Sequence, residues 1–114
     1  MPTLKLPGKG DRAYWDLIAQ WARDYRSDGC TMSPDWWLET CQEHDYHWRY
    51  GQTLFGDPIS FQASNLRFRQ AIQERSKLRW FNPISWERYY WVSSPIGRRI
   101  WDEHRRRNLR PPIL

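Results

Sequence analysis

The spacing of apolar residues along the chain predicts a bundle of helices. Between residues 11 and 25, apolar side chains recur at steps of three and four, which is typical of a helix with one buried face. The sequence Ser33-Pro34-Asp35 is typical of a helix start, because serine can cap, proline fits the first turn and a carboxylate suits the positive end. We expect this second helix to run to about Tyr50, where Gly51 ends it.

The second half of the chain continues this pattern. Residues 52–59 are expected to form a loop or a short irregular hairpin, and Ser60 can cap a third helix through about Arg75. Asn82-Pro83 predicts a break, followed by helical segments at 85–92 and 95–106. The 114 residues are expected to form one all-α domain with two antiparallel central helices. Residues 1–10 would form an N-terminal arm and residues 107–114 a basic, proline-containing tail.

The composition indicates a core built from aromatic rings. Aromatic residues make up 17% of the chain, with nine tryptophans, while the mean hydropathy is −0.94. Rings carry much apolar area and a polar tip, so they can replace aliphatic residues in the core. Disordered, collagen-like and coiled-coil classes do not fit this composition. No apolar run reaches the roughly 18 residues that would cross a bilayer, and we identify no signal peptide.

Four residues of the second predicted helix share one face. Cys41, His44, Asp45 and Trp48 lie at positions i, i+3, i+4 and i+7. The cysteine and the tryptophan indicate that this face points inward. A buried histidine and a buried carboxylate need partners, because burial of such groups without them is costly.

These residues resemble the phospholipase A2 superfamily. Cys41-Gln42-Glu43-His44-Asp45 is similar to its C-x-x-H-D signature, and Asp28-Gly29-Cys30 is similar to its calcium loop. The resemblance covers about residues 27–72. It implies a disulfide between Cys30 and Cys41, which correspond to the two cysteines that are bridged in the family.

The resemblance also implies a mechanism of ester hydrolysis. His44 would be the general base that activates water for attack on the sn-2 ester of a glycerophospholipid. Asp45 would bind Ca²⁺, together with the backbone carbonyls of Gly29, Thr31 and Ser33. The metal would polarise the ester carbonyl and stabilise the oxyanion.

Two positions depart from the family pattern in a compatible way. The carboxylate that orients the histidine corresponds here to Asn65, whose carbonyl can accept the histidine N–H but carries no charge. The tyrosine that normally donates to that carboxylate corresponds to Trp48, whose indole N–H can donate to the amide carbonyl. We expect Asn65 to face His44, and Asn65→Asp to raise activity if the protein is active.

A zinc site is the competing interpretation of the same residues. Cys30, Cys41, His44 and His47 form a Cys2His2 set. However, Cys41 and His47 diverge by roughly 120° around one helix, and the usual paired-cysteine knuckle is absent. We therefore favour calcium over zinc and expect His47 to face solvent.

The C-terminal part of the chain is rich in arginine. The net charge is +5, and the basic residues that would bind anions are Arg98, Arg99, Arg105, Arg106, Arg107 and Arg110. Anionic phospholipid membranes are the partner that we favour, because tryptophan and tyrosine also suit membrane interfaces. Nucleic acid is the alternative partner, although no common nucleic-acid-binding motif is present.

Three classes of function follow from these patterns. The leading hypothesis is a small phospholipase A2-like enzyme that acts as a monomer on membranes. The second is a non-catalytic binding module on the same scaffold, such as a phage or virus accessory protein in the host cytoplasm or on a particle. The third is a basic helical protein that binds nucleic acid.

Overall fold

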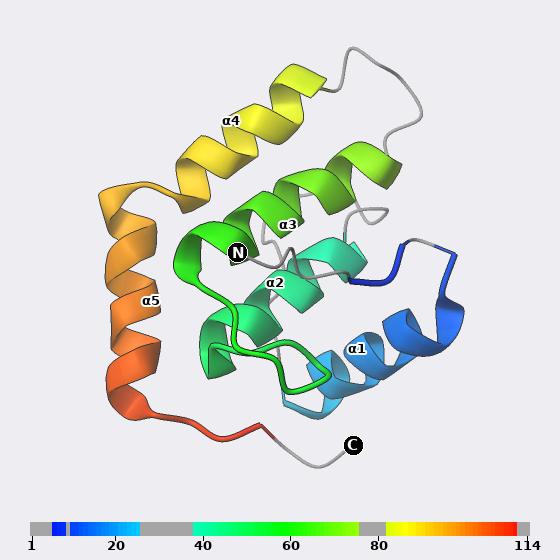
Figure 1. The fold of residues 1–114 in the computed structure, drawn as a ribbon, viewed down its shortest axis with the longest axis horizontal. Helices are drawn as coiled ribbons and strands as arrows, with labels where there is room; N and C mark the ends of the chain where they lie inside the picture. Colours follow the sequence, from blue (N-terminus) through cyan, green and yellow to red (C-terminus); the bar gives the residue numbers. More distant parts are fainter. Residues whose placement is uncertain (1–5, 9, 26–37, 76–81, 112–114) are drawn as a thin grey trace.

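The protein folds as a bundle of helices. A computed structural model describes residues 6–8, 10–25, 38–75 and 82–111. Within these residues there are five helices and no strand: α1 (Arg12–Asp24), α2 (Leu38–Tyr50), α3 (Phe61–Arg75), α4 (Asn82–Val92) and α5 (Pro95–Arg107) (Figure 1). The predicted all-α class is confirmed.

Helix α2 occupies the centre of the bundle. It packs against α1 on one side and against α3 on the other, and α4 covers the outer side of α3 (Figure 1). His44 of α2 contacts Asn65, whereas Trp48, one turn later, contacts Ser64 and Phe61. Later residues of α2 thus contact earlier residues of α3. The two helices are therefore antiparallel, as predicted.

The ends of the helices follow local chemistry. Asp11 caps α1 through the backbone N–H of Tyr14, and Ser60 accepts the N–H of Ala63 at the start of α3. Gly51 ends α2 in the left-handed region with φ 66°. The predicted start of α2 at residues 33–35 lies outside the described residues.

The segment between α2 and α3 is the expected short irregular hairpin. One isolated antiparallel bridge joins Gln52 to Pro58. The backbone N–H of Thr53 donates to Asp57, and that of Ile59 donates to Gly51. These bonds turn the chain back on itself and allow α3 to return along α2.

The start of α4 differs from the prediction. Asn82 and Pro83 were expected to break the chain before a helix at residue 85, but α4 begins at Asn82. Proline fits the first turn of a helix, where its missing N–H has no intrahelical partner to lose. The break signal therefore marks a helix start.

Aromatic rings form most of the core between α1 and α2, as the composition predicts. The buried cluster contains Tyr14, Trp15, Ile18, Trp21, Ala22 and Tyr46. The N-terminal arm is tied to this cluster, because the indole of Trp15 donates to the carbonyl of Gly8 at 2.9 Å.

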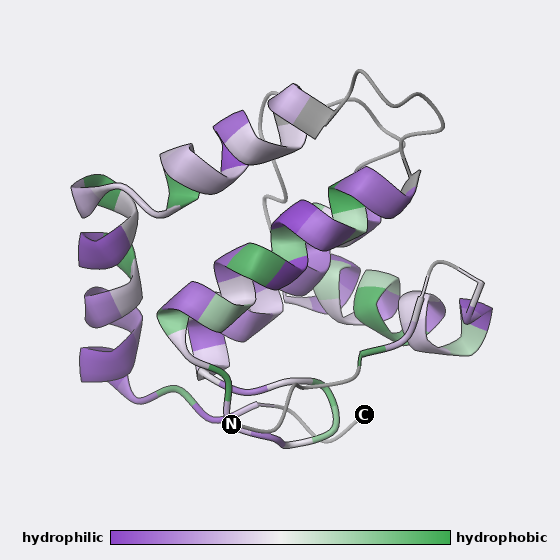
Figure 2. Ribbon diagram, turned by 45° about the horizontal axis from the view of Figure 1, so that its top comes forward, coloured by the Kyte–Doolittle hydropathy of each residue, from purple (hydrophilic) through white to green (hydrophobic). Residues whose placement is uncertain are grey.

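Helix α5 crosses the C-terminal end of α2 and is mainly hydrophilic (Figure 2). Its buried contacts are few: Trp101 packs on Trp48 and Phe61, and Gly97 lies against the α4–α5 turn. A Cβ on Gly97 would lie 2.0 Å from the carbonyl oxygen of Val92, so this close approach requires glycine. None of the helices in the described residues has both the length and the apolar character needed to cross a membrane.

Candidate active site

His44 and Asn65 face each other across the α2–α3 interface. Nε2 of His44 lies 2.7 Å from Oδ1 of Asn65, which is the contact that the sequence predicts. The imidazole stacks on Phe68, with ring centroids 4.5 Å apart, and lies 4.6 Å from the ring of Trp48. Antiparallel packing therefore holds a nearly buried histidine between two aromatic rings and one amide.

The side-chain amide of Asn65 is fully hydrogen-bonded. Oδ1 accepts from Trp48 Nε1 at 3.2 Å in addition to its contact with His44. On the other side, Nδ2 donates to the hydroxyl of Ser93 at 3.2 Å and to the carbonyl of Val92 at 3.4 Å. One residue thus joins α2, α3 and the α4–α5 turn.

These contacts determine the tautomer of His44. An indole N–H can only donate and a backbone carbonyl can only accept, so Trp48 and Val92 together fix which end of the Asn65 amide is oxygen. Since Oδ1 is an acceptor, Nε2 of His44 must carry the proton. Nδ1 is then the unprotonated nitrogen, with a lone pair that can accept a proton.

The surroundings of His44 keep it neutral. Its pKa is lowered to about 3, chiefly by burial; the hydrogen bond to Asn65 opposes this in part, and nearby His47 contributes to the lowering. Asn65 provides orientation without the negative charge that would stabilise an imidazolium. His44 thus has an unprotonated Nδ1, but this nitrogen is weakly basic.

Asp45 lies on the adjacent side of α2, with its side chain 24% exposed. Its Oδ2 is 3.3 Å from Nε of Arg49, whose guanidinium also donates to the backbone carbonyl of Tyr25. The predicted carbonyl ligands Gly29, Thr31 and Ser33 lie outside the described residues.

Of the predicted calcium ligands, only Asp45 lies within the described residues, and its chemistry is compatible with calcium. Asp45 supplies a partly accessible carboxylate, which is the hard oxygen ligand that Ca²⁺ prefers. A cation there would compete with Arg49. Among the described residues there is no group of three or more side chains that could hold a metal ion.

Cys41 is disulfide-bonded and packs against Phe68 and Ile72. Cys30, the partner that the resemblance implies, lies outside the described residues. A disulfide-bonded sulfur is not a thiolate, so Cys41 in this state cannot ligate zinc.

The prediction that His47 faces solvent is wrong. Its side chain is fully buried, and neither ring nitrogen has a hydrogen-bond partner in the described part of the chain. Burial lowers its pKa. The error has a structural cause: α2 is packed by both α1 and α3, and His47 lies one turn after Glu43, whose side chain contacts both of these helices.

A second buried polar cluster was not anticipated from the sequence. Glu43 is 1% exposed and accepts from Nε of Arg67 at 2.8 Å and from the hydroxyl of Tyr14. Arg67 also donates to the carbonyl of Pro7 at 2.7 Å. No sequence pattern pairs residues on α1, α2 and α3, so only the tertiary structure identifies this cluster, which joins all three helices and the N-terminal arm.

Most of the predicted anion-binding arginines have partners within the protein. Arg98 pairs with Asp102, and Arg106 and Arg107 both pair with Glu103. Arg105 donates to the carbonyls of Trp48 and Arg49, at 2.7 and 2.8 Å, and so caps the end of α2. For Arg99 and Arg110, we find no ion pair with a described residue.

Comparisons of the chain with protein-family models, with curated proteins and with solved structures give no match.

Proposed function

We propose that the protein is a phospholipase A2-like ester hydrolase in which His44 activates water for attack on a glycerophospholipid. The observation that supports this most strongly is the fixed tautomer of His44. Nε2–H is committed to Asn65 at 2.7 Å, which leaves Nδ1 as the base. Any buried histidine N–H needs an acceptor, but this acceptor is the one that leaves Nδ1 unprotonated, as a general base requires.

The chain's own residues would divide the chemistry as follows. A water molecule on Nδ1 of His44 loses its proton to that nitrogen as its oxygen attacks the ester carbonyl. Asn65 keeps the ring in place, and the rings of Trp48 and Phe68 restrict its movement. The proton on Nδ1 then passes to the leaving alkoxide, which regenerates the neutral histidine.

Calcium belongs to the same proposal through Asp45. When bound, the ion would polarise the ester carbonyl and stabilise the negative charge that develops on its oxygen. To bind the metal, the Asp45 carboxylate would have to give up its ion pair with Arg49, or use one oxygen for Arg49 and the other for the metal.

A membrane surface is the proposed location of the substrate. The net charge of +5 favours approach to anionic phospholipid. Arg99 and Arg110 are exposed and would contribute most, because several other arginines of this segment are engaged by carboxylates or by α2.

The direct test is fatty-acid release from mixed phospholipid vesicles with and without Ca²⁺. We expect release that depends on Ca²⁺ and is lost in His44→Gln. Asp16→Asn is the control, because it changes a largely exposed side chain of α1 and should retain activity. Equal release by wild type and His44→Gln, in protein shown to be folded, would exclude hydrolysis by this site.

A non-catalytic binding module is the second candidate, and one observation favours it. His44 is buried against an uncharged amide, which lowers its pKa to about 3, below the range in which a general base works best at neutral pH. In that case folded protein would bind phospholipid without releasing fatty acid, and His44→Gln would leave binding unchanged.

A further inference from the structure

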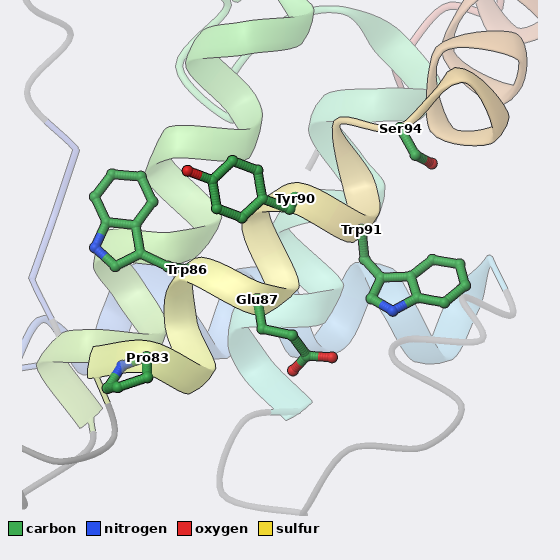
Figure 3. A pocket seen from close by; sticks show the side chains of 6 residues that line it. All are labelled: Pro83, Trp86, Glu87, Tyr90, Trp91 and Ser94. Carbon is green, nitrogen blue, oxygen red and sulfur yellow. The ribbon is translucent and has the colours of Figure 1, made fainter.

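Helix α4 presents a row of aromatic side chains to solvent. The residues follow helical spacing along its outer face and line a shallow hollow of about 580 Å³ (Figure 3): Pro83, Trp86, Glu87, Tyr90, Trp91 and Ser94. Five of these residues lie on α4, where the eight residue steps from Pro83 to Trp91 cover about 12 Å, and Ser94 is the N-cap of α5. This face is remote from α2, because α3 lies between the two helices (Figure 1).

The two most exposed aromatic side chains in the described part of the chain belong to this face. Tyr90 is 68% exposed and Trp91 is 62% exposed. Arg69 of α3 contacts the ring of Trp86, because its Cζ lies 4.3 Å from the ring centre. A contiguous exposed aromatic surface of this kind is typical of a binding site.

The charge of the face limits what it can bind. Glu87 is its one ionisable carboxylate, and it lies between the two tryptophans along the helix, as Figure 3 shows. Its contact with Arg88 is 4.0 Å long, at the limit for an ion pair, and its side chain is 55% exposed. Two arginines lie at the same face, Arg88 beside Glu87 and Arg69 on the ring of Trp86. The face therefore carries both signs of charge, as a zwitterionic headgroup does, and Glu87 with the ring of Trp91 is the part that attracts a cation.

We infer that the α4 face binds the quaternary ammonium headgroups of choline phospholipids at a bilayer surface. Trp91 would contact the methylated ammonium group through its ring face, and Glu87, which lies on the same side of α4, would supply the countercharge (Figure 3). Tyr90, whose ring packs toward Trp86, would lie among the neighbouring headgroups. Tryptophan and tyrosine also prefer the headgroup region of a bilayer, and the shallow, elongated hollow matches a flat surface better than a single small ligand. The inference rests on the proposed function only in taking a phospholipid as the ligand.

The test is sedimentation with sucrose-loaded phosphatidylcholine vesicles, using the full chain carrying His44→Gln so that hydrolysis plays no part. In this background, Trp91→Ala should lower partitioning about tenfold, since one buried tryptophan side chain contributes roughly that factor. Glu87→Gln should lower it about threefold. Phe55→Ala and Asp16→Asn remove an exposed ring and an exposed carboxylate elsewhere, and they should leave partitioning unchanged.

Tetramethylammonium chloride should compete with the vesicles better than sodium chloride at equal ionic strength. Two results would overturn the inference. One is partitioning that does not respond to Trp91→Ala or Glu87→Gln. The other is binding to phosphatidylglycerol vesicles only, or self-association through this face in place of vesicle binding. Because binding is read without catalysis, a failure here is separate from a failure of the hydrolase proposal.

Discussion

Replacing Asn65 by aspartate tests how the site is built. The substitution keeps the oxygen that faces His44 and Trp48 but changes the amide nitrogen into a second oxygen. The negative charge then lies beside the imidazole, at the 2.7 Å contact. An opposite charge at this range raises the pKa of a histidine by about 1–3 units, so the pKa of His44 should rise from about 3 toward its ordinary value.

The same substitution removes a donor. The second oxygen of the introduced carboxylate would lie against the carbonyl of Val92, which accepts from the native amide at 3.4 Å. Ser93 can rotate its hydroxyl and donate, but Val92 cannot. An acceptor that loses its partner in this way costs about 1–3 kcal/mol, or roughly 4–12 °C in Tm for a domain of this size. The asparagine is thus suited to this turn, and the expected gain in basicity is accompanied by a loss of stability.

Histidine NMR titration, thermal unfolding and vesicle hydrolysis give the three readouts. We expect a higher His44 pKa, a lower Tm and, if the hydrolase proposal holds, at least tenfold faster fatty-acid release. Gln62→Glu adds the same charge at an exposed position of α3 and should change none of them. A His44 pKa that stays near 3 in folded Asn65→Asp protein would refute the reasoning.

Three further predictions concern stability and metal binding. Gly97→Ala should destabilise the fold by about 1–3 kcal/mol in urea titrations, because the added Cβ would lie 2.0 Å from a backbone carbonyl; no change would mean that the α4–α5 turn adjusts freely. The free energy of unfolding should fall as the pH drops from about 6.5 toward 3, because the unfolded chain takes up protons that native His44 and His47 exclude. His47→Gln should flatten that slope, and an unchanged slope would contradict the burial argument. Arg49→Gln should tighten Ca²⁺ binding severalfold in calorimetry, because it frees the neighbouring carboxylate; weaker binding would argue against a calcium role.

The contact between His44 and Asn65 was predictable because it depends on two features only. His44 lies on the inward face of α2, and the next helix, α3, runs back along α2 in the opposite direction. Cys41, His44 and Trp48 are spaced for a single stripe, and the resemblance to phospholipase A2 identified the residue opposite. The all-α class was predictable for the same reason, since each helix has its own spacing or capping signal.

The burial of His47 could not be predicted in this way. Helical spacing identifies one buried face when a helix lies on a surface, but α2 is enclosed by two neighbours. The partners of Glu43 and of the Asn65 amide come from helices far along the chain, and no local pattern pairs them. The roles of Asp45 in metal binding and of His44 in catalysis remain predictions.

The capping of α2 by Arg105 has a consequence for the order of folding. The guanidinium reaches carbonyls 57 and 56 positions earlier in the chain, so a long loop must close before these bonds can form. Until then the carbonyls of Trp48 and Arg49 lack these donors, and the last turn of α2 should fray. An isolated α2–α3 hairpin would therefore hold His44 only loosely, and the packing around it should become ordered in a late, cooperative step when α5 docks.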